Sequence, residues 1–170
     1  ASSSRHLLAP YLNRITGHDH DGSVGGMMNI LAASKPKVVY HLAAMASSEH
    51  RMENVDQMVS ANVLFSTQLV EAMFRNGTKN LVNTETFWQY SKGAEEYAPV
   101  CLYAATKQAF RDILIYYTGN GHVNALSLVL YDTYGPDDPR KKLLTFLKQA
   151  AQEKRQIEMS PGEQIVDLMH

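Results

Sequence analysis

Short apolar runs alternate along the chain with longer segments of helical period. The clearest run covers residues 38–44 and directly follows Lys35-Pro36-Lys37. An apolar run of this length favours a strand that is covered on both faces, as in a parallel sheet. The runs at 80–84 and 123–131 predict two further strands.

Segments of helical period separate these predicted strands. Residues 57–76 place apolar side chains three and four positions apart, as in an amphipathic helix, and Gly77 is a natural stop. Residues 103–117 and 142–154 predict two more helices, and a shorter one opens at 25–31. This alternation is typical of a doubly wound α/β sheet, in which right-handed crossovers bring the strand ends to one ligand-binding edge.

The composition is that of a single globular domain over residues 1–170. The chain is 45% hydrophobic, which is enough for a sizeable core, and its net charge of -1 gives no electrostatic reason to expect nucleic acid or a membrane surface as a partner. No run approaches the roughly 18 apolar residues of a membrane span. The single Cys101 permits no intrachain disulfide, so we expect a reducing, cytoplasmic location. The seven histidines show no paired metal-ligand spacing, so we expect no metal.

Tyr103 and Lys107 are four residues apart and therefore share one face of the predicted helix. An ammonium beside a phenol stabilises the phenolate, so this tyrosine can donate a proton to a carbonyl oxygen while hydride moves. The alternative is simple packing of the ring on the lysine stem. Thr84, at the end of the preceding strand, can offer a hydroxyl to the same oxygen, or can act as a turn hydroxyl instead.

A series of motifs in order carries a family resemblance. They are His41-Leu42-Ala43-Ala44, Asn62-Val63-Leu64, Asn83-Thr84-Glu85-Thr86-Phe87-Trp88, Tyr103-Ala104-Ala105-Thr106-Lys107 and Tyr134-Gly135-Pro136. Together they resemble the NAD-dependent epimerase/dehydratase branch of the extended short-chain dehydrogenases/reductases. The stretch 83–167 is most similar to nucleotide-sugar 4-ketoreductases of the CDP-abequose synthase type. The resemblance implies a Rossmann-like parallel sheet that lacks its first β-α-β unit and its C-terminal substrate lobe in this chain.

On the cofactor side, the resemblance implies binding of NAD or NADP. The residues that it assigns to the cofactor are Leu42, Ala43, Ala44, Asn62, Tyr103, Lys107 and Tyr131. The glycine-rich turn that seats the pyrophosphate in the family is missing, and Gly25-Gly26 does not replace it. The family has an acidic residue on the adenine side of the cofactor, and Asp19 is the nearest counterpart of that residue in this chain. Lys142, with the two basic residues before it, can meet a pyrophosphate or can start a solvated helix.

On the substrate side, the resemblance implies that Thr84 orients the sugar, that Tyr103 is the acid/base, and that Lys107 holds the ribose and tunes the tyrosine. The residues that it assigns to the substrate are Thr84, Glu85 and Asp132. The implied function is NAD(P)-dependent 4-keto reduction or epimerisation of a nucleotide-linked sugar. A non-catalytic fragment or scaffold protein that retains the fold is the alternative.

Further features refine this expectation. Glu85 and Thr86 follow Thr84 where dehydratases carry an Asp-Glu pair, and Thr86 cannot act as the base, so elimination is disfavoured. Val129 and Val166 stand where many relatives have arginine. In those relatives the arginine at the position of Val166 commonly binds a substrate phosphate.

Quaternary structure can also be anticipated from the pattern. The helices at 57–76 and 103–117 are apolar on more than one face, and relatives pair these helices, so we expect a homodimer. The missing first strand predicts an unpaired sheet edge beside 38–44.

Overall fold

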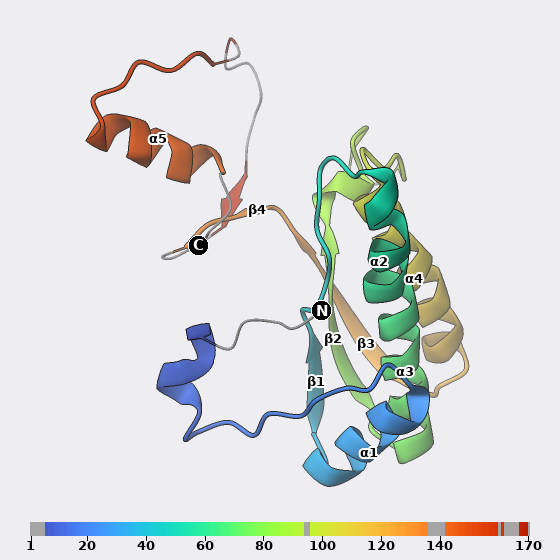
Figure 1. Cartoon of the computed structure of the whole chain (residues 1–170). Coiled ribbons are helices and arrows are strands. Elements are labelled where there is room, and N and C mark those ends of the chain that lie inside the picture. The colour runs from blue at the N-terminus through green and yellow to red at the C-terminus, as the bar shows by residue number, and fades with distance from the viewer. Residues whose placement is uncertain (1–5, 94–95, 136–141, 160, 162–166, 170) are drawn as a thin grey trace.

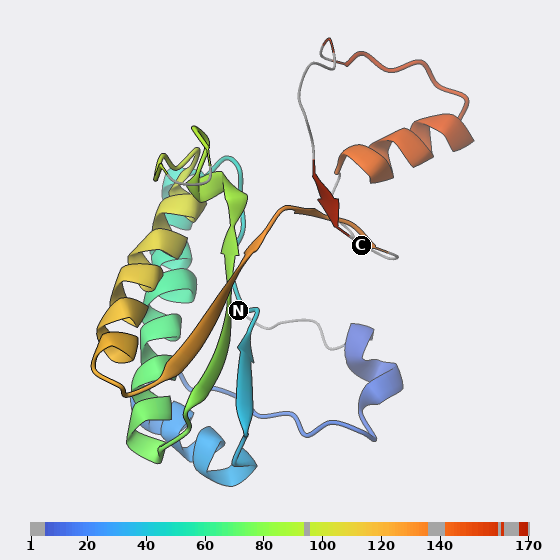
Figure 2. The same ribbon diagram turned by 180° about the vertical axis from the view of Figure 1, so that it is seen from behind.

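The computed structural model describes residues 6–93, 96–135, 142–159, 161 and 167–169. Its central feature is a three-stranded parallel sheet in the order β1, β2, β3. The strands are β1 (Val38–His41), β2 (Asn80–Thr86) and β3 (Asn124–Leu130). Four helices lie on one face of this sheet (Figures 1 and 2), namely α1 (Val24–Ser34), α2 (Val55–Val59), α3 (Phe65–Asn76) and α4 (Leu102–Gly119).

Shorter elements complete the described part of the chain. The 3-10 helices are η1 (His6–Tyr11), η2 (Met52–Asn54) and η4 (Phe87–Gln89), and the π-helical segment η3 (Ser60–Leu64) joins α2 to α3. Beyond the upper end of the sheet in Figure 1, β4 (Asp132–Thr133) pairs in parallel with β5 (Leu168–Met169), and α5 (Leu143–Gln152) lies between them in sequence.

Local sequence signals explain where the helices begin and end. Ser23 caps α1 by accepting a hydrogen bond from the Gly26 N–H at 2.9 Å, and Asp21 in turn accepts from the Ser23 N–H. Helix α3 ends at Gly77, whose φ of 70° lies in the left-handed region that glycine adopts without strain. The predicted helices and strands are therefore confirmed, with boundary shifts of a few residues.

The core lies between the sheet and its helices. Its buried side chains include Met27, Leu31, Leu69, Val70, Met73, Leu81, Phe110, Leu114 and Val123. Helices α1, α3 and α4 thus share one apolar layer with β2, and this packing fixes the height of α4 relative to the end of β2.

The opposite face of the sheet differs from the expectation for residues 38–44. Tyr40 is 68% exposed, and Val38, Leu126 and Leu128 are exposed beside it, because the described helices that pack on the sheet all lie on the other side. The prediction that this strand is covered on both faces is therefore wrong for the described residues. The predicted unpaired edge is confirmed, since β1 is an edge strand of the described sheet.

Candidate active site

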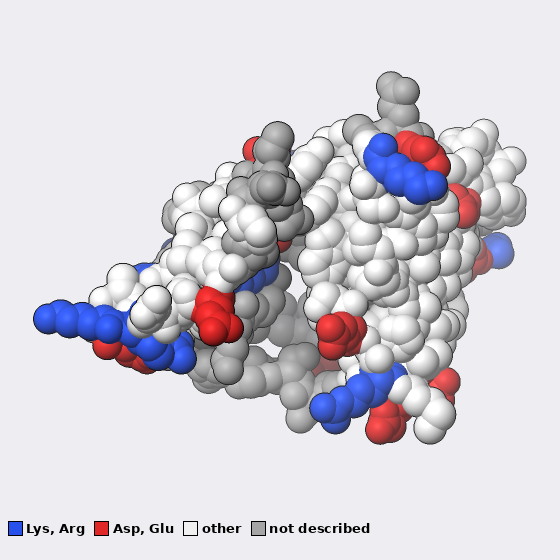
Figure 3. Space-filling model, turned by 90° about the horizontal axis from the view of Figure 1, so that it is seen from above, with Lys and Arg blue, Asp and Glu red and all other residues white. Residues whose placement is uncertain are grey.

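A cavity of about 650 Å³ opens where the strands end. Its lining comes from the loop after β1, the end of β2, η4, the start of α4 and the segment that leads into β4. Viewed from that end in Figure 3, the surface is mainly uncharged, and a hollow separates the sheet-and-helix body from the C-terminal elements. Carboxyl ends of parallel strands are where such sheets bind ligands.

Tyr103 lies in the first turn of α4 and lines this cavity. Helix α4 begins after Cys101, whose extended backbone (φ -157°, ψ 167°) turns the chain from the loop into the helix. The phenol ring meets Trp88 edge to face, with 6.2 Å between ring centroids. Tyr103 and Thr84 therefore line the same cavity at the strand ends.

Lys107 lies one turn further along α4 and is only 3% exposed. Burial lowers the pKa of its ammonium from 10.5 to about 8, while the negative charge of Glu85 opposes this shift. Lys107 does not line the cavity itself but lies behind Tyr103 on the helix. The predicted Tyr-Lys pair thus shares one helical face, with the lysine in the protein interior.

Two hydroxyls from β2 line the cavity, because alternate residues of a strand face the same side. Thr84 donates its hydroxyl proton to the His41 carbonyl oxygen at 3.0 Å. The Thr86 hydroxyl instead accepts from the Trp88 N–H at 3.4 Å, which leaves its own proton able to reach a ligand. Sequence reasoning assigned Thr84 and missed Thr86 as a hydroxyl donor, although the two-residue period of the strand pointed to it.

Asn62 lies in η3 and organises the loop after β1. Its side chain accepts from the Met45 N–H at 2.8 Å, donates to the Met45 carbonyl at 3.0 Å, and donates to the Thr106 hydroxyl at 2.9 Å. This buried residue ties the loop to α4 from outside the cavity lining. All three loop residues 42–44 are exposed, and of these Leu42 and Ala44 line the cavity while Ala43 does not.

The far wall of the cavity contains Tyr131 and Asp132. Tyr131 stacks on Phe87 with 5.4 Å between ring centroids and 8° between ring planes. Lys142 also lines the cavity, and its ammonium donates to the Thr133 carbonyl at 2.7 Å. Arg140, Lys141 and Val166 lie outside the described residues, as does Pro136 of the Tyr134-Gly135-Pro136 motif.

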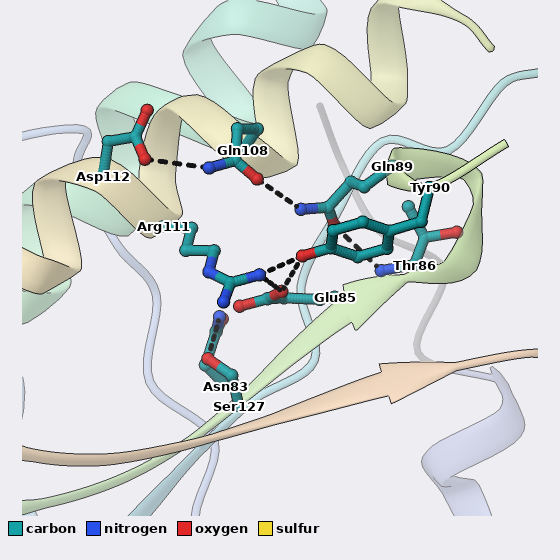
Figure 4. Close-up of polar contacts among 9 residues, drawn as sticks. All are labelled: Asn83, Glu85, Thr86, Gln89, Tyr90, Gln108, Arg111, Asp112 and Ser127. Carbon is teal, nitrogen blue, oxygen red and sulfur yellow. Dashed lines mark hydrogen bonds and ion pairs between the residues drawn. The ribbon is translucent and has the colours of Figure 1, made fainter. Parts of the chain in front are cut away.

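The carboxylate of Glu85 points to the helix side of β2. Its Oε2 lies 3.2 Å from Arg111 Nη1 and accepts from the Tyr90 hydroxyl at 3.5 Å, while Arg111 also contacts that hydroxyl (Figure 4). Burial, followed by the Glu85 charge, raises the pKa of Tyr90. Glu85 was expected to bind substrate, and although the residue contributes to the lining, its carboxylate is engaged between strand and helix.

His41 is the last residue of β1 and is also buried on the helix side. Its Nε2 lies 2.8 Å from the Ser66 hydroxyl. Burial, followed by the nearby Lys107 charge, lowers the pKa of His41 from 6.5 to about 4. The ring is therefore neutral at neutral pH. Within the part of the chain that the structure describes, no cluster of three or more His, Cys, Asp or Glu side chains can hold a metal ion.

No described helix is both long enough and apolar enough to span a membrane.

Comparisons with known proteins identify the family. The model of the NAD dependent epimerase/dehydratase family matches residues 12–170. CDP-abequose synthase of Yersinia pseudotuberculosis is 24% identical over 144 residues, covering 85% of this chain and 50% of that protein. A probable UDP-glucuronate 4-epimerase of Rhizobium meliloti is 30% identical over 113 residues, covering 61% of this chain and 33% of that protein. The chain thus spans half or less of these curated relatives.

Solved structures share the fold. A double mutant of dTDP-glucose 4,6-dehydratase from Streptomyces venezuelae, with NAD bound, matches with a TM-score of 0.81 at 18% identity, over 99% of this chain and 55% of that one. UDP-glucose 4-epimerase from Thermotoga maritima, with UDP-glucose, matches with a TM-score of 0.76 at 19% identity, over 88% of this chain and 53% of that one. These matches confirm the predicted Rossmann-like α/β fold with a parallel sheet. With the family model covering most of its length, the chain belongs to the NAD-dependent epimerase/dehydratase family.

Proposed function

We propose that this site serves NAD(P)-dependent 4-keto reduction or epimerisation of a nucleotide-linked sugar, with Tyr103 as the acid/base. One observation carries the proposal: Tyr103 and two threonine hydroxyls line the same cavity at the strand ends, and Lys107 lies one turn behind the phenol. This arrangement supplies a proton donor, a second hydrogen-bond donor and a stabilising cation around the space for one carbonyl group.

The residues divide the work of proton transfer. The phenol of Tyr103 gives its proton to the oxygen of the sugar carbonyl, or takes one from the corresponding hydroxyl in the reverse direction. The ammonium of Lys107 stabilises the phenolate that remains. A threonine hydroxyl holds the same oxygen, and the Thr86 proton is better placed for this than that of Thr84, which is bonded to His41.

The described residues fit the nicotinamide end of a dinucleotide. Leu42 and Ala44 are apolar residues of the cavity lining against which a flat ligand would lie. Tyr131 contributes an aromatic ring to the same lining. Tyr103 would lie against the ribose and the reacting carbon between these walls, and Lys107 would reach the ribose from its buried position one turn behind the phenol. The bound dinucleotide would supply or accept the hydride. Asn62 would act indirectly, because it fixes the loop that carries Leu42 and Ala44.

The side chains at the end of β2 favour reduction or epimerisation over elimination. Elimination needs a carboxylic acid/base pair next to the catalytic hydroxyl, and the Glu85 carboxylate is instead paired with Arg111 on the helix side. Thr86 has no basic group. Asp132 lines the opposite wall, where it is suited to contacts with sugar hydroxyls.

Tyr103→Phe tests the proposal. Removing the phenol oxygen should reduce turnover at least ~100-fold, the usual scale for a positioned acid/base, while the affinity for NADH or NADPH stays near that of the wild type. Tyr97→Phe is the matched control, since Tyr97 is exposed and lies outside the cavity lining. Wild-type turnover in Tyr103→Phe would end the assignment. A protein that binds neither dinucleotide at micromolar concentration would favour the non-catalytic alternative.

A further inference from the structure

Among the residues that the structure describes, two buried oxygen atoms between β2 and α4 have no hydrogen-bond partner. They are Asn83 Oδ1 and Glu85 Oε1, on alternate residues of the strand that face the same helix. Asn83 uses its amide nitrogen to bond the Ser127 hydroxyl at 3.2 Å, and Glu85 uses Oε2 for its contacts with Arg111 and Tyr90. An unpaired carboxylate oxygen in the interior costs free energy, so a donor for Oε1 is expected nearby.

Lys107 is the cation positioned to meet this need. It precedes Arg111 by four residues on α4, so the two cations lie on one face of the helix, and that face turns toward β2. Arg111 engages one oxygen of Glu85 and leaves the other unpartnered. Burial lowers the pKa of Lys107, and the negative charge of Glu85 acts in the opposite direction and raises it.

Within the described part of the chain, the other groups near Lys107 do not provide a counter-charge. From β1 it faces His41, which is neutral near pH 7 because burial lowers the pKa of its ring to about 4. On its own helix it is flanked by Tyr103 and by Arg111, the latter already paired. The neighbouring segments η3 and α3 contribute the uncharged Asn62 and Ser66 to this region. Glu85 is therefore the anion that acts on Lys107.

We propose that Glu85 is a positioning residue for Lys107: its unpartnered Oε1, through one bound water, holds the ammonium in its charged form behind Tyr103. This inference rests on the proposed function for its catalytic meaning. It deepens that function by assigning a task to a carboxylate that is paired with Arg111 on the helix side of β2.

The test is a titration of Lys107 that requires no turnover. Carbon-13 NMR of the lysine side chains follows the Lys107 ammonium in the cofactor-free protein, with Lys107→Arg used to assign its signal. Glu85→Gln keeps the size of the side chain and removes its charge. The titration midpoint of Lys107 should then fall by on the order of one pH unit. The high-pH limb of kcat/KM should move to lower pH by the same amount.

The chain offers a matched control in a second Glu-Arg-Tyr group. Glu71 contacts Arg75 at 2.7 Å and accepts from the Tyr117 hydroxyl at 2.7 Å, on α3 and away from Lys107. Glu71→Gln should lower stability to a similar or smaller extent and leave the Lys107 midpoint unchanged. Glu85→Asp keeps the charge one methylene farther away, so its midpoint should lie between those of the wild type and Glu85→Gln.

Unchanged Lys107 midpoints in Glu85→Gln and Glu85→Asp would overturn the inference, as would an equal shift in Glu71→Gln. If Glu85→Gln does not fold, the Asp variant decides by the same criterion. A shifted midpoint in a protein whose Tyr103→Phe variant keeps full activity would support the Glu85–Lys107 coupling while removing the proposed catalytic function, so the two failures are distinguishable.

Discussion

Lys107 and His41 are buried ionisable side chains that share one interior region. Burial is the main cause of the lowered pKa of each. Their consequences differ. The charge of Lys107 is useful to a phenolate at the cavity, whereas His41 serves packing as a neutral ring between Phe65 and Phe110.

Replacing Lys107 by Ala should reduce both turnover and cofactor affinity, because one ammonium serves the phenol and the ribose. In the wild type, activity should fall as the pH rises through about 8, where Lys107 loses its charge. Steady-state kinetics across pH 6–10, with separate dinucleotide titrations, check both statements. An unchanged dinucleotide affinity in Lys107→Ala would contradict the ribose role.

The two cavity threonines should respond differently to removal of the hydroxyl. Thr86→Val should lower turnover more than Thr84→Val, because the Thr84 proton is already donated to the His41 carbonyl. Thr84→Val should chiefly cost stability, about 1 kcal/mol for a lost buried hydrogen bond. Turnover and urea unfolding of both variants decide the matter, and a larger turnover loss in Thr84→Val would restore the role predicted from sequence.

The free energy of unfolding should depend on pH through the protonation of His41. The unfolded chain takes up a proton on this ring near pH 6.5, while the folded protein resists it until about pH 4. Protonation of His41 therefore does not reduce the free energy of unfolding above pH 6.5. Between pH 6.5 and 4 the free energy of unfolding falls, by about 3 kcal/mol for this difference in pKa. Unfolding curves of His41→Gln should show a flatter pH profile over that window. The same profile in His41→Gln and wild type would contradict this, and His50→Gln, an exposed site, is the control.

At the scale of elements, the π-helical turn η3 places Asn62 where it can clamp the loop after β1. A π turn inserts an extra residue into a helix, and such insertions often occur beside functional sites. Here the turn directs Asn62 onto both backbone groups of Met45 and onto Thr106, whose hydroxyl donates to the Tyr103 carbonyl at 2.7 Å. Helix α4 and the cavity loop are thereby joined through one side chain.

Asn62→Ala should loosen this loop. Losing a buried amide that bonds two backbone groups should reduce the free energy of unfolding by about 1–3 kcal/mol, and the dinucleotide affinity should weaken because Leu42 and Ala44 move. Asn120→Ala, at the exposed end of α4, is the control: it removes an exposed bond to the Tyr116 carbonyl and should leave the dinucleotide affinity unchanged. Denaturant unfolding and cofactor titration give the two readouts. Unaltered affinity in Asn62→Ala would show that the loop is held by other contacts.

At the scale of the whole molecule, apolar side chains are exposed on both the helix layer and the open sheet face. On the helix side these include Leu64 in η3 and Ile115 and Tyr116 in α4, and on the sheet side Tyr40 and Leu126. Exposed apolar surface of this extent favours association. The homodimer predicted from the sequence stays a prediction, and we expect its contact on the helix layer.

The dimer contact can be tested by placing a charge on each face. Ile115→Asp should shift the protein toward monomer at tens of micromolar, since a carboxylate would be buried in the contact. Leu126→Asp on the sheet face should leave the helix-mediated dimer intact. Sedimentation velocity measures both variants. A monomeric wild type, or a dimer lost only in Leu126→Asp, would contradict the assignment to the helix layer.

Local patterns in the sequence determined the helices and strands and the position of the Tyr103–Lys107 pair on one helix. The apolar runs predicted β1, β2 and β3, and the four-residue spacing of Tyr103 and Lys107 placed both on one face of a helix that starts at the strand ends. These predictions succeeded because strand and helix periods depend on neighbours a few residues apart. The motif order likewise identified the family, which depends on sequence alone.

Tertiary structure decided what those side chains meet. Glu85 and Arg111 are 26 residues apart, and their pairing depends on how α4 packs across β2. The bonds from Thr84 to His41 and from Asn62 to Met45 likewise join separate elements. Exposure of Tyr40 depends on which elements cover the sheet. Such contacts follow from the arrangement of elements in space, and a periodic pattern along the chain carries no information about which distant residue packs opposite.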